Sequence, residues 1–333
     1  MAGSKLRTVK RIYLDQNKWI DLAAAEKEQP KGAPFGDVLV LLRAAVDASE
    51  VSLPLSSVHY METNTRRHWE SRRDLGVTML ALSRLHTIAP PDAVVPAEID
   101  RALRERYGRP ASVRPLRPFG RGASHAFARE IPRYRIPEDL VDMVADRWDF
   151  ERQANQLQEA LFLTGAPPAF EKRMPDFDPL AHLQVGERYA RDKEALRELR
   201  QAGNWHRGEG ADRLAKAQAL TDHLEVINDA LERAGISADL LLAEGPTGMS
   251  EFREAVPTMF ASSELERLRH SGSQKAWERQ DLLDISALAV ACVYCDIVVT
   301  ERFWVDAGHR AELDERFGTT LLHRLTDLPA LVV

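Results

Sequence analysis

Residues 11–23, RIYLDQNKWIDLA, change their hydrophobic pattern at Asp15. Residues 9–14 form a short apolar run, which is typical of a buried strand. The apolar residues that follow at helical spacing are Trp19, Ile20, Leu22 and Ala23. A strand that runs straight into a helix is the first unit of an α/β fold. We therefore predict a strand that ends at Asp15 and a helix over residues 17–28.

The same alternation appears again, first over residues 35–89 and then near the end of the chain. VSLPL (51–55) and LHTIAPP (85–91) read as strands, with helical spacing before and between them. Residues 278–295 read as a helix, DIVVTE (296–301) as a buried strand, 306–318 as a helix that stops at Gly318, and 319–325 as a last strand. Helices and strands that alternate at both ends predict an α/β fold whose parallel sheet is built from both termini.

The middle of the chain has a different character. No convincing strand pattern occurs between residues 90 and 273, where helical candidates dominate. These candidates are residues 97–106, 138–163, 179–201, 211–234 and 250–270. We therefore divide the chain into an N-terminal core half (8–90), a mainly α-helical insertion (91–274) and a C-terminal core half (275–333).

The composition describes an ordinary globular chain of 333 residues, with 44% hydrophobic and 29% charged residues. The net charge of −6 gives no global attraction to nucleic acid, so any such surface must be local. No stretch approaches the ~20 apolar residues of a membrane helix, so we expect no membrane partner. Cys292 and Cys295 lie in an apolar run, which predicts buried thiols and, without a disulfide framework, a cytoplasmic location.

Five carboxylates stand where predicted strands end or predicted helices begin: Asp15, Glu62, Asp281, Asp284 and Glu301. In a right-handed βαβ layout these positions share one edge of the sheet, so we expect the acids to meet there. Their mutual repulsion would have to be offset by a divalent cation. Oxygen ligands of this kind suit Mg²⁺ or Mn²⁺.

Each acid also has a simpler explanation. Asp15 could cap the helix after it, and Glu62 could form a surface ion pair with Arg66. Asp281 or Asp284 could merely favour the amino end of a helix. Each such explanation accounts for one acid, whereas none accounts for their shared edge.

Three segments resemble motifs of the PIN-like nuclease superfamily: IYLDQNKWIDLA (12–23), LPLSSVHYMET (53–63) and DLLDISALAVACVYCDIVVTER (281–302). The resemblance covers residues 8–90 and 275–333 and implies a PIN-like, Rossmann-like core. It implies that Asp15, Glu62 and Asp284 are catalytic metal ligands, with Asp281 as a supporting or alternative ligand. Thr300 and Glu301 match the last motif, although the family commonly has an aspartate where this chain has Arg302.

The resemblance implies a metal-dependent endoribonuclease that uses Mg²⁺ or Mn²⁺, of a toxin, RNA-processing or defence type. Asn17 would then orient a metal-bound water or the scissile phosphate, or else help to cap the first helix. His59 lies three residues before Glu62 and shares its helix face, so it could serve the metal or relay a proton. A structural, buried histidine is the alternative.

An acidic pocket repels nucleic acid, so positive charge is needed beside it. We predict nucleic-acid contacts by Arg66, Arg67, Arg117 and Arg121, the last two from an Arg-, Pro- and Gly-rich segment with interleaved aromatics. The expected partner is nucleic acid, RNA rather than DNA. A catalytically inactive scaffold that binds RNA or protein through the insertion is the alternative. The apolar end TDLPALVV (326–333) leaves open a homodimer or a segment that finishes the sheet.

Overall fold

The computed structural model describes residues 9–168, 181–203, 208–272 and 276–332. Four parallel strands form its main sheet in the order β2-β1-β5-β6. These are β1 (Lys10–Leu14), β2 (Val51–Ser52), β5 (Ile297–Val299) and β6 (Thr320–Leu322). Because Leu14 pairs with Val299, a strand from the end of the chain lies directly beside the first one. The predicted α/β fold with a parallel sheet drawn from both termini is confirmed.

Period-two alternation along the strands divides the core between the two faces of the sheet. Ile12 and Leu14 face a cluster built with the helices of the N-terminal half. Tyr13 and Val298 face the opposite cluster, which is built largely from the C-terminal helices. The N-terminal helices are α1 (Gln16–Glu26), η1 (Pro30–Phe35), α2 (Gly36–Asp47), α3 (Ser57–Asn64) and α4 (Trp69–Ser83).

The C-terminal half starts with α15 (Arg279–Tyr294), which is followed directly by β5. Cys292 and Cys295 are free thiols buried in its packing, as predicted. The elements after β5 are α16 (Arg302–Arg310), α17 (Leu313–Phe317), η3 (Leu325–Asp327) and α18 (Pro329–Val332). The helix predicted over 306–318 is thus two helices, the second of which ends at Gly318 with φ of +68°. Leu331 and Val332 pack on the core cluster around β1, so the apolar end finishes this half of the fold.

A second, two-stranded sheet corrects the prediction that residues 90–273 contain no strand. β3 (His86–Ile88) pairs antiparallel with β4 (Phe119–Arg121). Thr87 of β3 also forms an isolated parallel bridge with Leu55, which follows β2 in the chain. β4 has the sequence FGR, which is too short to show an alternating pattern and contains a glycine, so its pairing comes from tertiary contact alone.

The insertion is otherwise helical, with three breaks that the hydrophobic spacing did not predict. The helix expected over 138–163 is a 3₁₀ helix that ends at Met143 and a separate α-helix that begins at Arg147. The helix expected over 211–234 is interrupted at His223, and the one over 250–270 starts anew at Pro257. Proline has no N–H and a fixed φ, so it opens a helix more easily than it continues one. The helices of this region are α5 (Pro91–Tyr107), α6 (Gly122–Ala126), η2 (Glu138–Met143), α7 (Arg147–Thr164), α9 (Ala181–Ala202), α10 (Gly208–Asp222), α11 (Leu224–Ala234), α12 (Ala238–Leu242), α13 (Gly245–Glu254) and α14 (Pro257–Gly272).

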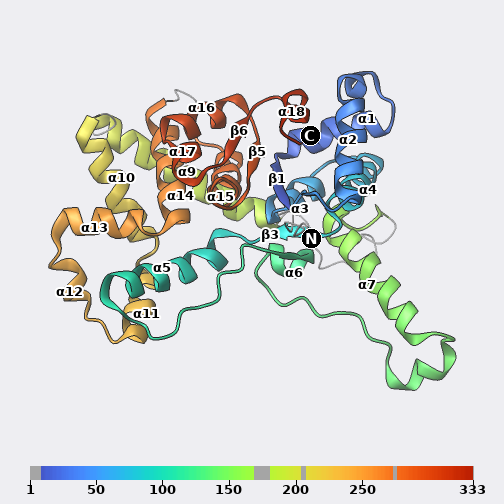
Figure 1. Cartoon of the computed structure of the whole chain (residues 1–333), viewed down its shortest axis with the longest axis horizontal. Helices are drawn as coiled ribbons and strands as arrows, with labels where there is room; N and C mark the ends of the chain where they lie inside the picture. The colour runs from blue at the N-terminus through green and yellow to red at the C-terminus, as the bar shows by residue number, and fades with distance from the viewer. Residues whose placement is uncertain (1–8, 169–180, 204–207, 273–275, 333) are drawn as a thin grey trace, which may run out of the picture.

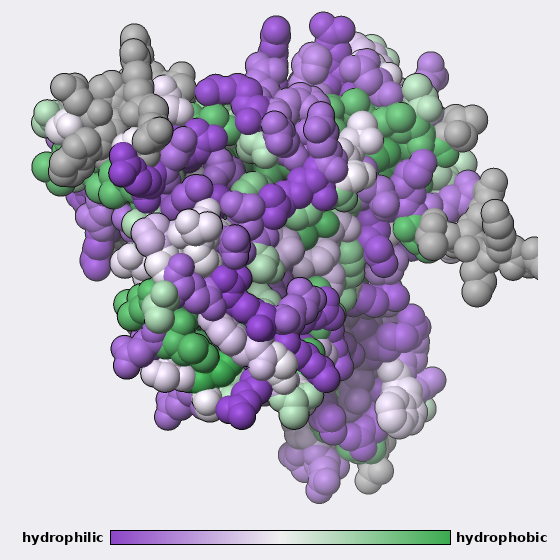
Figure 2. All heavy atoms as spheres, turned by 60° about the vertical axis from the view of Figure 1, so that its left-hand side comes forward, coloured by the Kyte–Doolittle hydropathy of each residue, from purple (hydrophilic) through white to green (hydrophobic). Residues whose placement is uncertain are grey.

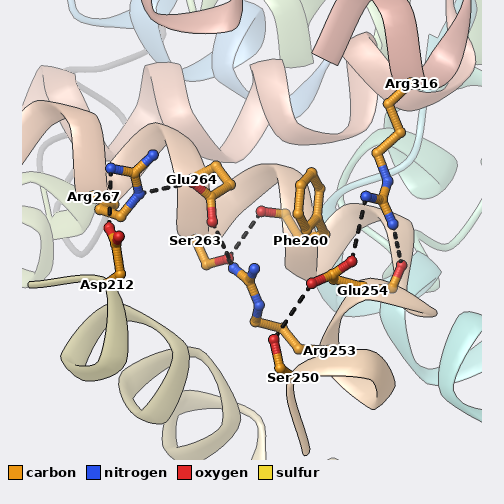
Figure 3. A network of polar contacts seen from close by, with 9 residues as sticks. All are labelled: Asp212, Ser250, Arg253, Glu254, Phe260, Ser263, Glu264, Arg267 and Arg316. Atoms are coloured by element: carbon orange, nitrogen blue, oxygen red, sulfur yellow. Dashed lines mark hydrogen bonds and ion pairs between the residues drawn. The ribbon is translucent and has the colours of Figure 1, made fainter. Parts of the chain in front are cut away.

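The insertion flanks the core on both sides: α10–α13 lie at one end of the molecule, and α7 projects at the other (Figure 1). A polar network joins α13, α14 and α17 (Figure 3). In this network, buried Arg253 donates to Ser263 and to Glu264, at 2.6 and 2.8 Å. Arg316 of the core lies 4.0 Å from the ring centre of Phe260 and donates to the Glu254 carbonyl. The insertion and the C-terminal half therefore pack as one body at this junction.

The surface in Figure 2 is mostly hydrophilic, with a few separate hydrophobic areas. Among the described helices, none has the length and the apolar character that crossing a membrane requires.

Candidate active site

A pocket of about 540 Å³ opens at the carboxyl ends of β1 and β5, where α1 and α16 begin. α3 and α15 supply further parts of its wall. All five carboxylates that the sequence analysis placed at this edge line the pocket: Asp15, Glu62, Asp281, Asp284 and Glu301. Residues more than 200 positions apart in the sequence are thus brought together by the parallel sheet.

Asp15 both caps a helix and faces the pocket. Its Oδ1 accepts the backbone N–H of Gln16 at 2.6 Å, which satisfies the first turn of α1. Its Oδ2 accepts the hydroxyl of Thr300 at 2.8 Å, so the end of β5 fixes the carboxylate. Burial raises the pKa of Asp15, and the nearby Glu301 carboxylate adds to the rise.

Glu62 and Asp284 converge on one side-chain amide. Nε2 of Gln280 donates to Oε1 of Glu62 and, at 3.0 Å, to Oδ1 of Asp284. The other oxygen of Asp284 accepts the indole N–H of Trp304 at 3.0 Å. Burial raises the pKa of Glu62 to about 7 and the pKa of Asp284 well above its ordinary value. Repulsion by Asp15 contributes to both rises.

The hydrogen-bond donors to these three acids are all neutral groups: an amide, an indole, a hydroxyl and a backbone N–H. Within the described residues, no lysine or arginine forms an ion pair with Asp15, Glu62 or Asp284. The alternative pairing of Glu62 with Arg66 does not form, because Arg66 donates to the hydroxyl of Ser71. Three partly buried carboxylates therefore share a pocket without an ion-pair partner among the described residues.

Asp281 has a different environment, which corrects its predicted role as a supporting ligand. Nε and Nη2 of Arg269 donate to its two oxygens, both at 2.8 Å. Oδ2 also accepts the backbone N–H of Glu278 at the start of α15. This bidentate pair attaches α14 to α15, so Asp281 serves packing and helix capping.

His59 is also corrected, because its side chain turns into the core. The ring is 0% exposed, and its Nε2 lies 2.8 Å from the carbonyl oxygen of Leu14. Its Nδ1 accepts the backbone N–H of Ser56 at 2.8 Å, which leaves Nε2 as the donor. Burial lowers the pKa of His59 to about 4. With both nitrogens occupied by the backbone, the ring is structural and is neither a metal ligand nor a proton relay.

Asn17 and Glu301 meet at the rim of the pocket, where Nδ2 of Asn17 donates to Oε1 of Glu301 at 3.3 Å. Oδ1 of Asn17 is buried and has no hydrogen-bond partner in the described structure. Since Asp15 caps α1, Asn17 is not needed for that task. Arg302, at the position where the resembling motif commonly has an aspartate, is exposed and pairs with Asp306.

The four arginines predicted to contact nucleic acid all lie outside the lining of this pocket. Arg66 lines a neighbouring groove, and Arg67 is exposed just beyond α3. Arg117 is exposed, and Arg121 donates to the Arg84 carbonyl beside a separate groove along α7. The Arg-, Pro- and Gly-rich segment therefore does not supply the walls of the acidic pocket.

Gln280 and Trp304 contact Glu62 or Asp284 in the pocket, and neither was predicted from the sequence. Gln280 lies one helical turn before Asp284, so the i, i+4 spacing could have indicated it. Trp304 follows Glu301 by three residues on α16, and its indole could have been expected among the apolar contacts only. Both side chains orient the carboxylates that they contact.

The donor set fits a hard divalent cation, because Asp15, Glu62 and Asp284 offer only oxygen. The described residues contain no ready-made group of three or more Asp, Glu, His or Cys side chains that could hold a metal ion. Instead, the amide nitrogen of Gln280 occupies the point on which Glu62 and Asp284 converge. A cation held by these acids would take the place of that amide.

In comparisons with known proteins, no family model, curated protein or solved structure matches this chain. The chemistry of the pocket must therefore be inferred from its own residues.

Proposed function

We propose that this protein is a metal-dependent phosphodiester hydrolase, an endoribonuclease whose Mg²⁺ or Mn²⁺ is held by Asp15, Glu62 and Asp284. The observation that carries the proposal is the gathering of these partly buried carboxylates in one open pocket with neutral hydrogen-bond donors only. Bringing three acids together without a cationic partner is costly, and a divalent cation is the partner that would offset the cost. The order of the three acidic motifs and the parallel sheet support a PIN-like assignment.

When bound, the cation would neutralise charge on the phosphate and favour ionisation of the attacking water. The chain's own residues have positioning roles. Thr300 and Trp304 hold Asp15 and Asp284 in fixed orientations, as partners behind metal ligands do. The buried Oδ1 of Asn17 can accept a hydrogen bond from a water in the pocket. The pocket volume lies in the usual range for small-molecule sites.

The test is cleavage of a single-stranded RNA by the purified full chain, with and without EDTA, after addition of Mg²⁺ or Mn²⁺. We expect cleavage that needs the metal and is lost in Asp15→Asn. The matched control is Asp306→Asn, which removes an exposed acid paired with Arg302 and should cleave normally. Robust cleavage in EDTA or by Asp15→Asn would refute the proposal.

A second candidate is a catalytically inactive scaffold that binds RNA or protein. The observation that favours it is the Gln280 amide, which donates a hydrogen bond to both Glu62 and Asp284 without a metal. This candidate predicts binding that is indifferent to chelators and no turnover by pure protein. A carboxylate-bound cation can act on the phosphodiesters of RNA and of DNA. Cleavage of DNA in the same assay would therefore support the proposed hydrolysis with a different substrate.

A further inference from the structure

A second hollow of about 280 Å³ adjoins the acidic pocket. It lies between the C-terminal half of α1 and the first turns of α4, and we call it the α1–α4 groove. Ile20 lines both hollows, so the two are neighbours that share this side chain. Its polar lining includes the cationic residues Lys27, Lys31 and Arg66 and the exposed imidazole of His68.

The cations of the α1–α4 groove differ in how far they are paired within the protein. Lys27 lies 3.3 Å from Asp74, an acid that Arg73 also contacts at 3.0 Å, so Lys27 shares its acidic partner with a second cation. Arg66 donates both Nε and Nη2 to a neutral hydroxyl, so its positive charge is not neutralised by that contact. Lys31 is exposed and forms no ion pair within the described chain. Only Glu70 opposes these cations among the remaining lining residues.

The floor of the groove is apolar. Ala23, Ala24 and Leu75 line it beside Ile20. A lining that combines cations with apolar side chains suits a single nucleic-acid strand, whose phosphates need positive charge and whose sugars and bases present apolar faces. His68 adds a ring on which an unpaired base can stack.

We infer that the α1–α4 groove binds the phosphate backbone of a single nucleic-acid strand next to the phosphodiester that lies in the acidic pocket. This inference rests on the proposed function, because it makes the groove the continuation of that active site. The pocket itself repels the substrate, so the adjoining cations supply the attraction that holds the strand across it.

A groove along α7 offers an internal comparison. It is larger, about 680 Å³, and is lined by Arg133, Arg135 and a Trp148 side chain that is 82% exposed. Its lining shares no residue with that of the acidic pocket, whereas the α1–α4 groove shares Ile20. The residues that line the α7 groove would by themselves favour it as the strand-binding site. The α1–α4 groove is favoured because it adjoins the acidic pocket.

The experiment compares two charge reversals in the Asp284→Asn background, which keeps the RNA intact. One variant carries Lys27→Glu and Lys31→Glu, and the matched control carries Arg133→Glu and Arg135→Glu. Binding of a fluorescent 12-nucleotide single-stranded RNA is measured over a range of salt concentrations. We expect the lysine pair to weaken binding at least tenfold and to reduce the salt slope by about 1.4, as two lost contacts to a single strand should.

The arginine control should stay within twofold of the parent, and the single Lys31→Gln variant should show a smaller loss than the double reversal. Equal or greater weakening by the arginine pair, an unchanged affinity in the lysine pair, or no RNA binding by the parent would each overturn the inference. Cleavage is measured separately, with native Asp284. If cleavage is absent while the binding pattern holds, the nuclease proposal fails and the strand-binding groove stands.

Discussion

Two groups of buried acids in this molecule differ in what they face. In the insertion, Glu266 accepts a hydrogen bond from Lys193 and lies 3.6 Å from His270. Burial alone would raise the pKa of Glu266, but the His270 contact and the Lys193 charge lower it to about 2. In the pocket, Glu62 has no such partner, and its pKa rises to about 7. The pKa of a glutamate is therefore lowered in one region and raised in the other.

The contrast is sharpest within one turn of α15. Asp281 is held by the Arg269 guanidinium, whereas Asp284, three residues on, has only Gln280 and Trp304 as donors. A buried charge is stable when it is paired and hydrogen-bonded, and costly when it is not. Glu266 and Asp281 are thus paired with cationic side chains, whereas Glu62 and Asp284 have only neutral hydrogen-bond donors. This difference is why we place the chemistry in the pocket.

The strongest test of this comparison exchanges Asp284 and Asp281 for asparagine in separate variants. In Asp284→Asn we expect RNA cleavage to fall by more than about 100-fold, beyond the usual loss from an outer partner of a metal ligand. Its melting temperature should stay level or rise, because one of three repelling acids is removed. Asp281→Asn should instead lower the melting temperature, because Arg269 loses a bidentate partner. A common loss of stability in both variants would show that the two acids are structurally equivalent.

The next test breaks a satisfied acid of the insertion. Glu266→Gln leaves Lys193, whose side chain is only 6% exposed, with Asp222 at 3.6 Å as its remaining acid. Breaking a buried pair by removing one partner typically costs about 3 kcal/mol or more. We expect the free energy of unfolding in urea to fall by about that amount in Glu266→Gln. The matched Glu62→Gln change should leave it unchanged or raise it, and equal losses would contradict the comparison.

The pH dependence of stability should distinguish the contribution of Glu62 from that of His59, although both residues lie on α3. The pKa of Glu62 is about 7 in the folded chain against 4.5 for a free glutamate, so the folded state binds the extra proton between these values. Its contribution to the free energy of unfolding therefore falls as pH rises through that window, by at most about 1.4 kcal/mol per pH unit. His59, with a pKa of about 4 against 6.5, acts in the opposite direction between pH 4 and 6.5.

Denaturant titrations from pH 4 to 8 without divalent metal provide the measurement. Around Glu62, the charges of Asp15 and Glu301 favour the proton, and Arg279 opposes it. Glu62→Gln should lack the contribution of Glu62 that falls with rising pH, so the stability of the variant relative to that of the wild type should rise between pH 5 and 7. If the profiles of wild type and variant run parallel over that range, Glu62 titrates normally and the pocket is better compensated than we infer.

The sequence predicted the position of the acids better than their partners. The change of hydrophobic period at Asp15 and the strand before Thr300 fix where the chain turns, and a parallel sheet brings those turns to one edge. Asp281 could not be assigned from its spacing, because Arg269 reaches it only through the packing of α14 on α15. His59 shares a helix with Glu62, but local contacts with Ser56 and β1 decide which way it turns.

The smallest expected effect concerns Gln280, whose amide occupies the point between Glu62 and Asp284. If a cation replaces that amide, binding includes the cost of breaking two hydrogen bonds, and Gln280→Ala removes the cost. In the wild type, only the molecules in which the Gln280 amide has left the two acids can bind the cation, which weakens the apparent affinity. We expect Mn²⁺ to bind about threefold tighter to Gln280→Ala, because this competing state is removed. Calorimetric titration with Mn²⁺ measures this, with Asp284→Asn as the variant that should bind poorly. A tenfold weakening in Gln280→Ala would mean instead that Gln280 positions the acids for the metal, as an outer partner does.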